Sequence, residues 1–187
     1  MQAFTYSNPA SVADAAQAAA AGAKLVAGGQ SLLPSMKLGL AAPDALADLG
    51  GIAELKGITV AGGAVKIGAM TTHAAVAASA DVQKAIPALA DLAGNIGDRQ
   101  VRNRGTIGGS LANNDPAACY PAAVLGLGAT VHTNKRDIAA DDFFQGIYTT
   151  ALAEDEIITA VSFPIPEKAG WQKFKQPASR FSIVGVF

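Results

Sequence analysis

Apolar and small residues form short periodic segments in the first third of the chain, separated by glycine and polar positions. Ser11 is typical of a helix N-cap, so the Ala-rich segment behind it predicts a helix over Val12–Ala21 that ends at Gly22. Two compact apolar segments, Lys24–Ala27 and Ala45–Leu49, predict buried strands. This part of the chain is therefore expected to place one helix beside two strands.

The next apolar segments predict a β-hairpin. Ile58–Ala61 and Ala64–Ile67 are short and contain β-branched residues, and the Gly62-Gly63 pair between them suits a two-residue turn. Capping residues then mark two helices: His73–Ala78 after Thr71 or Thr72, and Ala88–Ala93 after Pro87.

The second half of the chain continues this mixture. Asp98–Gly105 contains three arginines and has no apolar period, so it is expected to be a loop. Asp115-Pro116 resembles an N-cap with its first helical residue and predicts a helix to about Leu125. Apolar segments predict four more strands: Ala129–Thr133, Ile157–Phe163, Trp171–Gln176 and Ser182–Phe187. Because strands and helices alternate without the regularity of a doubly wound sheet, the predicted fold class is α+β.

Composition narrows the classes of function. Half of the residues are hydrophobic, 16% are charged and the formal net charge is −1, which is typical of a compact cytoplasmic domain. The chain has no basic run that would indicate nucleic-acid binding, and no apolar segment is long enough to span a bilayer. Cys119 is the single cysteine, which excludes an internal disulfide and an iron–sulfur cluster, and His73 and His132 are not spaced as metal ligands. Redox chemistry would therefore need an organic cofactor or a partner.

A glycine pair marks the first candidate site. Gly28-Gly29 directly follows a predicted strand, where glycine allows positive φ and lets consecutive backbone N–H groups converge on an anion such as a pyrophosphate. Gln30 and Ser31 add uncharged donors. The alternative is a tight strand-to-helix turn with no ligand.

A second segment, Asn103–Asn113, repeats this composition. It has three glycines within five residues, and hydroxyls at Thr106 and Ser110. Neither segment is a Walker A motif, and Gly126-Leu127-Gly128 lacks the third glycine of a Rossmann fingerprint. Two such segments favour a dinucleotide held by backbone nests on another fold.

The two segments together resemble the FAD motifs of one family. Ala27–Lys37 is similar to the first, and Gln100–Ser110 to the second, FAD motif of the medium subunits of carbon monoxide dehydrogenase-like and xanthine dehydrogenase-like molybdenum hydroxylases. Further landmarks follow in the expected order: Asp142–Gly146, Glu156–Ile158 and Lys173–Lys175. The resemblance covers essentially the whole chain.

The resemblance implies the FAD-binding fold of the vanillyl-alcohol oxidase (PCMH) type, made of two α+β subdomains. These would be residues 1–56 and 57–168, and residues 169–187 would begin a truncated C-terminal domain. The chain stops within the apolar run Ile183–Phe187. A domain rarely ends on such a strand, so a longer protein is expected.

The resemblance also implies FAD as the cofactor and assigns its contacts, with no catalytic residue and no metal ligand. The first motif would hold the pyrophosphate and adjoining ribose through Lys24, Leu25, Val26, Ala27, Gly28, Gly29, Gln30, Ser31 and Leu32. The second would hold the other side of the pyrophosphate and the ribityl chain through Thr106, Gly108, Gly109, Ser110 and Asn113. Elsewhere, Ile96 would lie near the adenine, Ile157 or Ile158 near the isoalloxazine, and Lys175 near its N1/O2 edge.

One position departs from the family pattern. Cys119 stands where many relatives carry an acid, and a thiol replaces a carboxylate poorly as a hydrogen-bonding group. Asp115 offers a substitute from the preceding turn, and Cys119 itself is interpreted as a buried structural thiol. Among the nearby arginines, Arg102 is expected to brace its segment through backbone carbonyls, although contact with phosphates or with an acidic partner surface is the alternative.

The implied function is electron transfer. An FAD subunit of this family would receive electrons from the [2Fe–2S] clusters of a small partner subunit, in a complex with a molybdopterin-containing large subunit, and pass them to an external acceptor. Two alternatives remain: a stand-alone flavin oxidase, and a redox-inert truncated fragment or partner-binding domain without FAD. Bound flavin, or its absence, separates the electron-transfer subunit from the redox-inert fragment.

Overall fold

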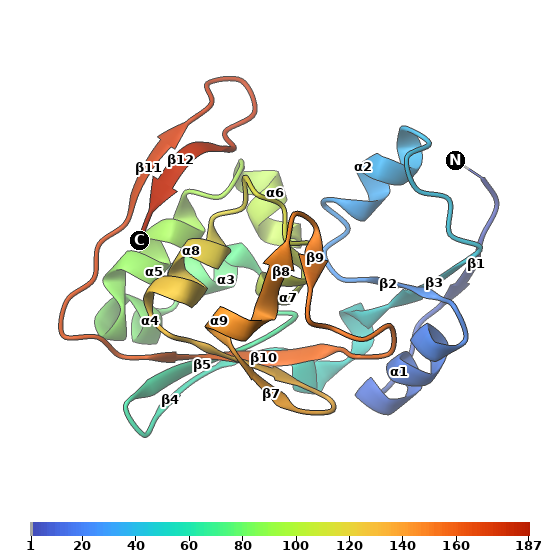
Figure 1. The fold of residues 1–187 in the computed structure, drawn as a ribbon, viewed down its shortest axis with the longest axis horizontal. Coiled ribbons are helices and arrows are strands. Elements are labelled where there is room, and N and C mark those ends of the chain that lie inside the picture. Colours follow the sequence, from blue (N-terminus) through green and yellow to red (C-terminus); the bar gives the residue numbers. More distant parts are fainter. Residues whose placement is uncertain (1) are drawn as a thin grey trace.

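The computed structural model describes residues 2–187, whose two larger sheets lie side by side (Figure 1). The first sheet is parallel and has the order β1-β3-β2, with strands Thr5–Ser7, Ala45–Asp48 and Lys24–Val26. Two helices accompany it: α1 (Val12–Ala20) and α2 (Leu32–Lys37). Ser11 caps α1 as predicted, because its hydroxyl accepts a hydrogen bond from the amide of Asp14 (3.1 Å).

The second sheet is antiparallel and has the order β4-β5-β10-β6-β7. Its strands are Ile58–Ala61, Ala64–Gly68, Ile158–Pro164, Thr130–Thr133 and Asp137–Ala139. Helices lie over one of its faces in Figure 1, among them α3 (His73–Ala78), α4 (Ala80–Ala85), α5 (Pro87–Gly94), α7 (Ile107–Asn113) and α8 (Tyr120–Gly126). The strand side chains that face them, such as Val65, Val131 and Phe163, are fully buried and join the helices in the largest hydrophobic core.

Shorter elements complete the fold. Two 3-10 helices, Leu49–Gly51 and Ala53–Leu55, connect the two sheets. The others are α6 (Arg99–Arg104), α9 (Ala140–Phe143), the hairpin of β8 (Phe144–Gly146) and β9 (Thr149–Thr150), and the hairpin of β11 (Gln172–Lys175) and β12 (Ser182–Val186). None of the helices among residues 2–187 has the length and hydropathy that crossing a membrane requires.

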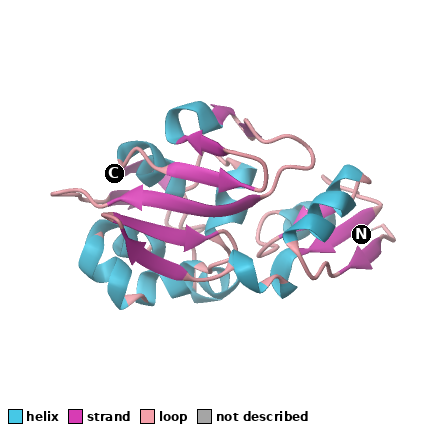
Figure 2. Ribbon diagram, turned by 90° about the horizontal axis from the view of Figure 1, so that it is seen from below, coloured by secondary structure: helices cyan, strands magenta, loops and turns pink. Residues whose placement is uncertain are grey.

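A small apolar cluster joins the two sheets. Leu49, Ile52 and Leu55 of the connecting segment pack with Met70 and Ile157 from the second sheet's side. Ile52 and Leu55 are almost fully buried. The parallel sheet with its helices and the antiparallel sheet with its helices form two units, which are therefore held in contact by a shared core. Figure 2 shows the two sheets side by side.

Three local predictions are wrong. Asp98–Gly105 is not a loop but contains helix α6, because the carboxylate of Asp98 caps it by accepting from the amide of Val101 (2.8 Å). The second glycine segment, where a backbone nest was predicted, forms helix α7. The Asp115-Pro116 pair makes a turn, since the Asp115 carboxylate accepts from the amide of Ala117, and the helix begins only at Tyr120.

Candidate functional site

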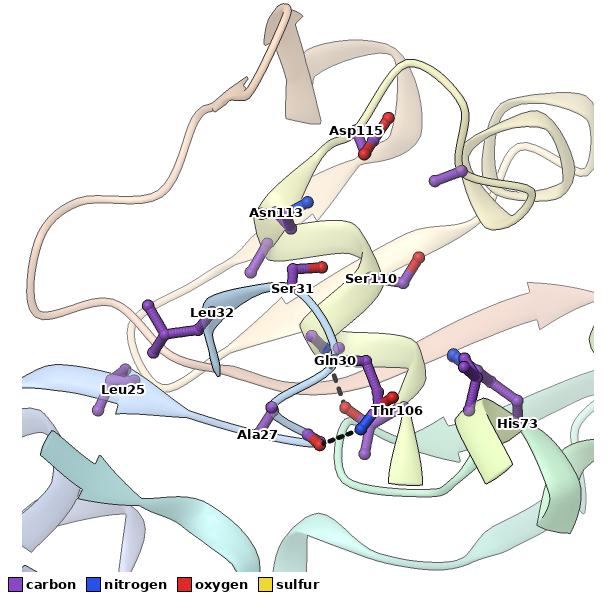
Figure 3. Close-up of a pocket in the computed structure, with 18 of the residues that line it drawn as sticks. Leu25, Ala27, Gln30, Ser31, Leu32, His73, Thr106, Ser110, Asn113 and Asp115 are labelled. Atoms are coloured by element: carbon purple, nitrogen blue, oxygen red, sulfur yellow. Dashed lines mark hydrogen bonds between the residues drawn. The ribbon is translucent and has the colours of Figure 1, made fainter. Parts of the chain in front are cut away.

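A cavity of about 980 Å³ lies between the two units. Both glycine segments line it, and so do residues from the β8–β9 and β11–β12 hairpins. Its volume is at the upper end of the range for small-molecule sites, roughly 300–1,000 Å³. Figure 3 shows labelled side chains of the two glycine segments on facing walls.

Most of the predicted contact residues meet at this cavity. Those that line it are Lys24, Leu25, Ala27, Gly28, Gly29, Gln30, Ser31, Leu32, Ile96, Thr106, Gly108, Gly109, Ser110, Asn113, Ile157 and Ile158. Val26 lies in the core of the first unit with Met36 and Leu46, and Lys175 is exposed on β11. Neither of these two lines the cavity.

The first glycine segment presents free backbone donors. Within residues 2–187, the amides of Gly29, Gln30, Ser31 and Leu32 donate to no other group of the chain. Gly29 has φ 72°, a conformation that side-chain-bearing residues rarely adopt, and it turns the chain out of β2. Adjacent unpaired N–H groups beside a cavity are a suitable site for an anion such as a pyrophosphate.

The neighbouring residue, Gly28, must be a glycine because of close packing and not because of its backbone conformation. A Cβ on Gly28 would lie 2.1 Å from the carbonyl oxygen of Arg104, at the end of α6. The first glycine segment therefore rests directly on the backbone that leads into the second. The Gln30 side chain adds to this arrangement by donating to the Gly28 carbonyl (3.2 Å; Figure 3).

The first amides of the second glycine segment already donate hydrogen bonds to other groups of the protein. Thr106 is buried and caps α7, accepting from the amide of Gly109 (3.2 Å), while the amides of Ile107 and Gly108 donate to the carbonyls of Thr71 and Ala69. The predicted backbone nest is therefore absent from this segment, whose contribution to the cavity is its surface and its side chains. Those side chains include Ser110 and Asn113.

Gly109 brings the two segments together. A Cβ at this position would lie 3.1 Å from the Cβ of Ala27 and 2.9 Å from Thr106 Oγ1. Gly108 also lines the cavity, but a Cβ on it would lie only 2.6 Å from the Cβ of Ala69. The two glycines therefore have different tasks, since Gly109 lets the two glycine segments approach each other at the cavity and Gly108 packs the helix on the sheet.

A lysine and the single cysteine form one end of the wall. Lys173, not Lys175, lines the cavity, and its ammonium donates to the carbonyl of Asn95 (2.9 Å) and to Cys119 Sγ (3.3 Å). Cys119 is 5% exposed and also lies 3.4 Å from Ser182 Oγ. The cysteine is thus a buried thiol that ties the β11–β12 hairpin to the helices, in agreement with its structural interpretation.

The cavity wall contains a neutral histidine. Burial, with a smaller contribution from the positive charge of Arg102, lowers the pKa of His73 to about 4. His73 is therefore uncharged at neutral pH. Arg102 braces its segment as predicted, because one guanidinium nitrogen donates to the carbonyls of Ile96 (3.2 Å) and Gly97 (3.1 Å).

Three strained residues surround the cavity and were not found from the sequence. Asn114, Tyr148 and Arg180 are the non-glycine residues with positive φ among residues 2–187, and the last two line the cavity. The Asn114 side chain donates to the carbonyls of Gly146 (2.7 Å) and Thr149 (2.9 Å), which fixes the β8–β9 hairpin beside the site. Strain of this kind concentrates at functional sites. The sequence offered one signal for these positions: Asn114 is an asparagine, a residue type that tolerates the left-handed conformation.

The fold and the cavity together define a flavin-binding domain of the PCMH type, and comparison with known proteins specifies it. Residues 2–166 match the family described as the FAD binding domain in molybdopterin dehydrogenase. The chain therefore belongs to this family of oxidoreductase domains. The family, the fold and the FAD cofactor predicted from the sequence are confirmed.

Relatives and solved structures agree with this assignment. The chain is 39% identical over 193 residues to the nicotine 6-hydroxylase medium subunit of Paenarthrobacter nicotinovorans, covering 100% of this chain and 68% of that protein. It is 40% identical over 194 residues to the carbon monoxide dehydrogenase medium chain of Hydrogenophaga pseudoflava, covering 97% and 67%. A solved carbon monoxide dehydrogenase from Hydrogenophaga pseudoflava matches with TM-score 0.94 and 39% identity over 98% of this chain and 68% of that one. Two other relatives match over 59% of their own length, through 87% and 86% of this chain.

Proposed function

We propose that this chain is the FAD-binding, electron-transferring part of a molybdenum-containing hydroxylase or dehydrogenase complex. The observation that carries the proposal is the row of four unpaired amides, Gly29 to Leu32, beside a cavity large enough for a dinucleotide. Two relatives are named as a medium subunit or medium chain, of nicotine 6-hydroxylase and of carbon monoxide dehydrogenase. By this analogy, electrons arrive from the [2Fe–2S] clusters of a small subunit that serves a molybdopterin-containing large subunit, and leave to an external acceptor.

The residues of the cavity suit the cofactor. When bound, FAD supplies the redox chemistry, and the chain's part is to hold and shield it. The amides of the first glycine segment would bind the pyrophosphate, and Ser110 and Asn113 would bind the polar chain that joins it to the rings. Ile157 and Ile158 are buried in the wall and would exclude water from the isoalloxazine. Ile96 would lie against the adenine.

A cytoplasmic location is part of the same proposal. It rests on the composition and on the single buried cysteine, Cys119, because proteins of reducing compartments rarely depend on disulfides.

The visible spectrum of the purified chain tests the proposed function. We expect a flavin spectrum and the release of FAD at close to one molecule per chain, because the unpaired amides and the cavity are already formed in the structure. The released cofactor is identified by chromatography. A chain that stays colourless after incubation with FAD would refute the proposal and support the redox-inert alternative.

The lysines of β11 provide a second test. Lys175 is the proposed cation beside the N1/O2 edge of the flavin, where a positive charge favours the reduced, anionic ring. Lys175→Met should therefore lower the two-electron reduction potential, by about 30 mV for each 1.4 kcal/mol of lost stabilisation. Spectroelectrochemical titration of the FAD-loaded chain measures this potential.

Lys173→Met is the matched variant, since Lys173 is the lysine that lines the cavity. If Lys173→Met lowers the potential and Lys175→Met does not, the role assigned to Lys175 passes to Lys173. If neither variant changes the potential, no lysine of β11 tunes the flavin.

A further inference from the structure

A serine, a histidine and an aspartate form a hydrogen-bonded chain on the second sheet, away from the cavity. His132 of β6 lies between the other two: its Nδ1 is 2.6 Å from Asp137 Oδ1, and its Nε2 is 2.7 Å from Ser162 Oγ. None of the three lines the cavity described above. Nothing in the proposed flavin function uses them.

The sheet register explains why these side chains meet. His132 is paired with Asp137 across β6 and β7, so both point to the same face. Ser162 of β10 is two residues beyond Ala160, the residue paired with His132, and it is therefore a diagonal neighbour on that face. An irregularity in β10 between Ile158 and Ala160 sets this register. Bulges often re-aim side chains in this way.

The face that carries this cluster is the one opposite the helices. Val131 and Val161, adjacent to the cluster along their strands, are fully buried under the helices, and alternation turns their neighbours outward. Figure 2 shows the sheet from this side, with strands in front of helices. The Asp137 side chain is 67% exposed and that of His132 is 19% exposed. Small molecules in solution can therefore reach the cluster.

The order of the hydrogen bonds fits nucleophilic activation. A carboxylate only accepts hydrogen bonds, so His132 Nδ1 carries a proton toward Asp137, and in the tautomer with its single proton there Nε2 accepts a hydrogen bond from the Ser162 hydroxyl. This is the relation of nucleophile, base and orienting acid in a Ser–His–Asp triad. Ser162 thus has a base in place to take its proton.

A cation lies on the other side of the serine. Lys66 of β5 is directly opposite Ser162 in the antiparallel ladder and is exposed on the same face. Its ammonium favours the approach of an anion. The amides around Ser162 belong to the sheet ladder. A reagent with a good leaving group, which depends less on oxyanion stabilisation, therefore suits this site better than an ordinary ester or amide does.

We propose that Ser162 is an acylation site that takes its acyl group from a small anionic donor of the acyl phosphate class. The Ser162 Oγ–carbon bond forms, the bond between the acyl carbon and the phosphate oxygen breaks, and phosphate leaves with the electron pair. The hydroxyl proton passes to His132 Nε2 and from there to solvent. Asp137 holds the ring and stabilises its transient positive charge.

Acetyl phosphate and the FAD-loaded chain test the proposal. The protein is incubated with acetyl phosphate near neutral pH, and the rate of O-acetylation is measured at each serine by peptide mass spectrometry. We expect Ser162 to react about 100-fold faster than Ser7 and Ser35, the range that general base catalysis supplies. The hydroxyls of those two serines donate to the backbone carbonyls of Leu46 and Ser31 rather than to a side-chain base.

Substitutions of the neighbouring side chains separate their contributions to the acetylation rate of Ser162. His132→Gln should reduce the Ser162 rate to that of the comparison serines, and Asp137→Asn should reduce it to a smaller degree. Lys66→Met should slow acetylation by acetyl phosphate but not by the neutral reagent p-nitrophenyl acetate. FAD content and the urea unfolding midpoint show that each variant is folded. Equal reaction of Ser162 and Ser7, or an unchanged Ser162 rate in folded His132→Gln protein, would overturn the proposal.

Discussion

Gly109→Val is expected to weaken FAD binding at least about 100-fold, or about 2.7 kcal/mol. A side chain at Gly109 would occupy the narrow space in front of Ala27, where the two glycine segments face each other across the proposed pyrophosphate site. It would also press on Thr106 Oγ1, the cap of α7, which adds a stability cost of about 1 kcal/mol. The loss of binding should therefore far exceed the loss of stability.

Two further glycines make this prediction specific. Gly170→Val is the matched control, because a Cβ at Gly170 meets no atom within 4 Å and its φ is not positive. Gly108→Ala should mainly lower the free energy of unfolding, since its Cβ would strike Ala69 beneath the helix. FAD affinity is measured by quenching of flavin fluorescence, and stability by urea titration. An unchanged FAD affinity in folded Gly109→Val protein would place the pyrophosphate elsewhere.

The sequence could identify the glycine segments but not the reason for each glycine. Gly29 needs its positive φ, Gly28 and Gly108 are required by close packing against another backbone, and Gly109 lets the two glycine segments approach each other at the cavity. These roles look identical in a motif because the neighbours that create them, Arg104 and Ala69, come from other segments. Among residues 2–187, the first segment keeps four amides unpaired, as a nest requires, whereas the second segment pairs its first amides within the protein.

The secondary structure, too, could be predicted only where the local sequence determines it. The hairpin of β4 and β5 followed from local pattern and turn residues alone. Helix α6 did not, because its six residues lack an apolar period, and a cap from Asp98 and packing beside α3 stabilise it instead. The lysines of β11 are a further example: Lys173 and Lys175 differ by a short step along one strand, and only the fold shows which of them enters the cavity wall.

The segment before Ile157 and Ile158 is anchored by a buried acid. Glu156 lines the cavity, and its side chain is only 1% exposed. Its carboxylate accepts hydrogen bonds from Arg136 Nε (2.9 Å), from the Thr133 hydroxyl (2.8 Å) and from the amide of Ala153 (3.0 Å). These hydrogen bonds hold the segment that leads into Ile157 and Ile158 against the turn between β6 and β7.

This anchor should make the stability of the protein depend on pH in acid. The hydrogen bond from Arg136, followed by those from Ala153 and Thr133, lowers the pKa of Glu156 from 4.5 to about 2 despite the opposing effect of burial. Because the pKa is lower in the folded state, the stabilisation is fully present above the unfolded-state value of 4.5. It is lost as the pH falls from there toward 2.

Glu156→Gln is therefore expected to lower the free energy of unfolding by about 2 kcal/mol at neutral pH. The pKa difference sets an upper bound of about 3 kcal/mol, and the half-exposed guanidinium of Arg136 reduces it through solvent screening. Urea titrations of both proteins at several pH values should show this difference shrinking between pH 4.5 and pH 2. Glu167→Gln, at an exposed position, is the control and should change stability little. A Glu156→Gln deficit that stays constant across this range would show that the carboxylate stabilises the fold by packing rather than by its charge.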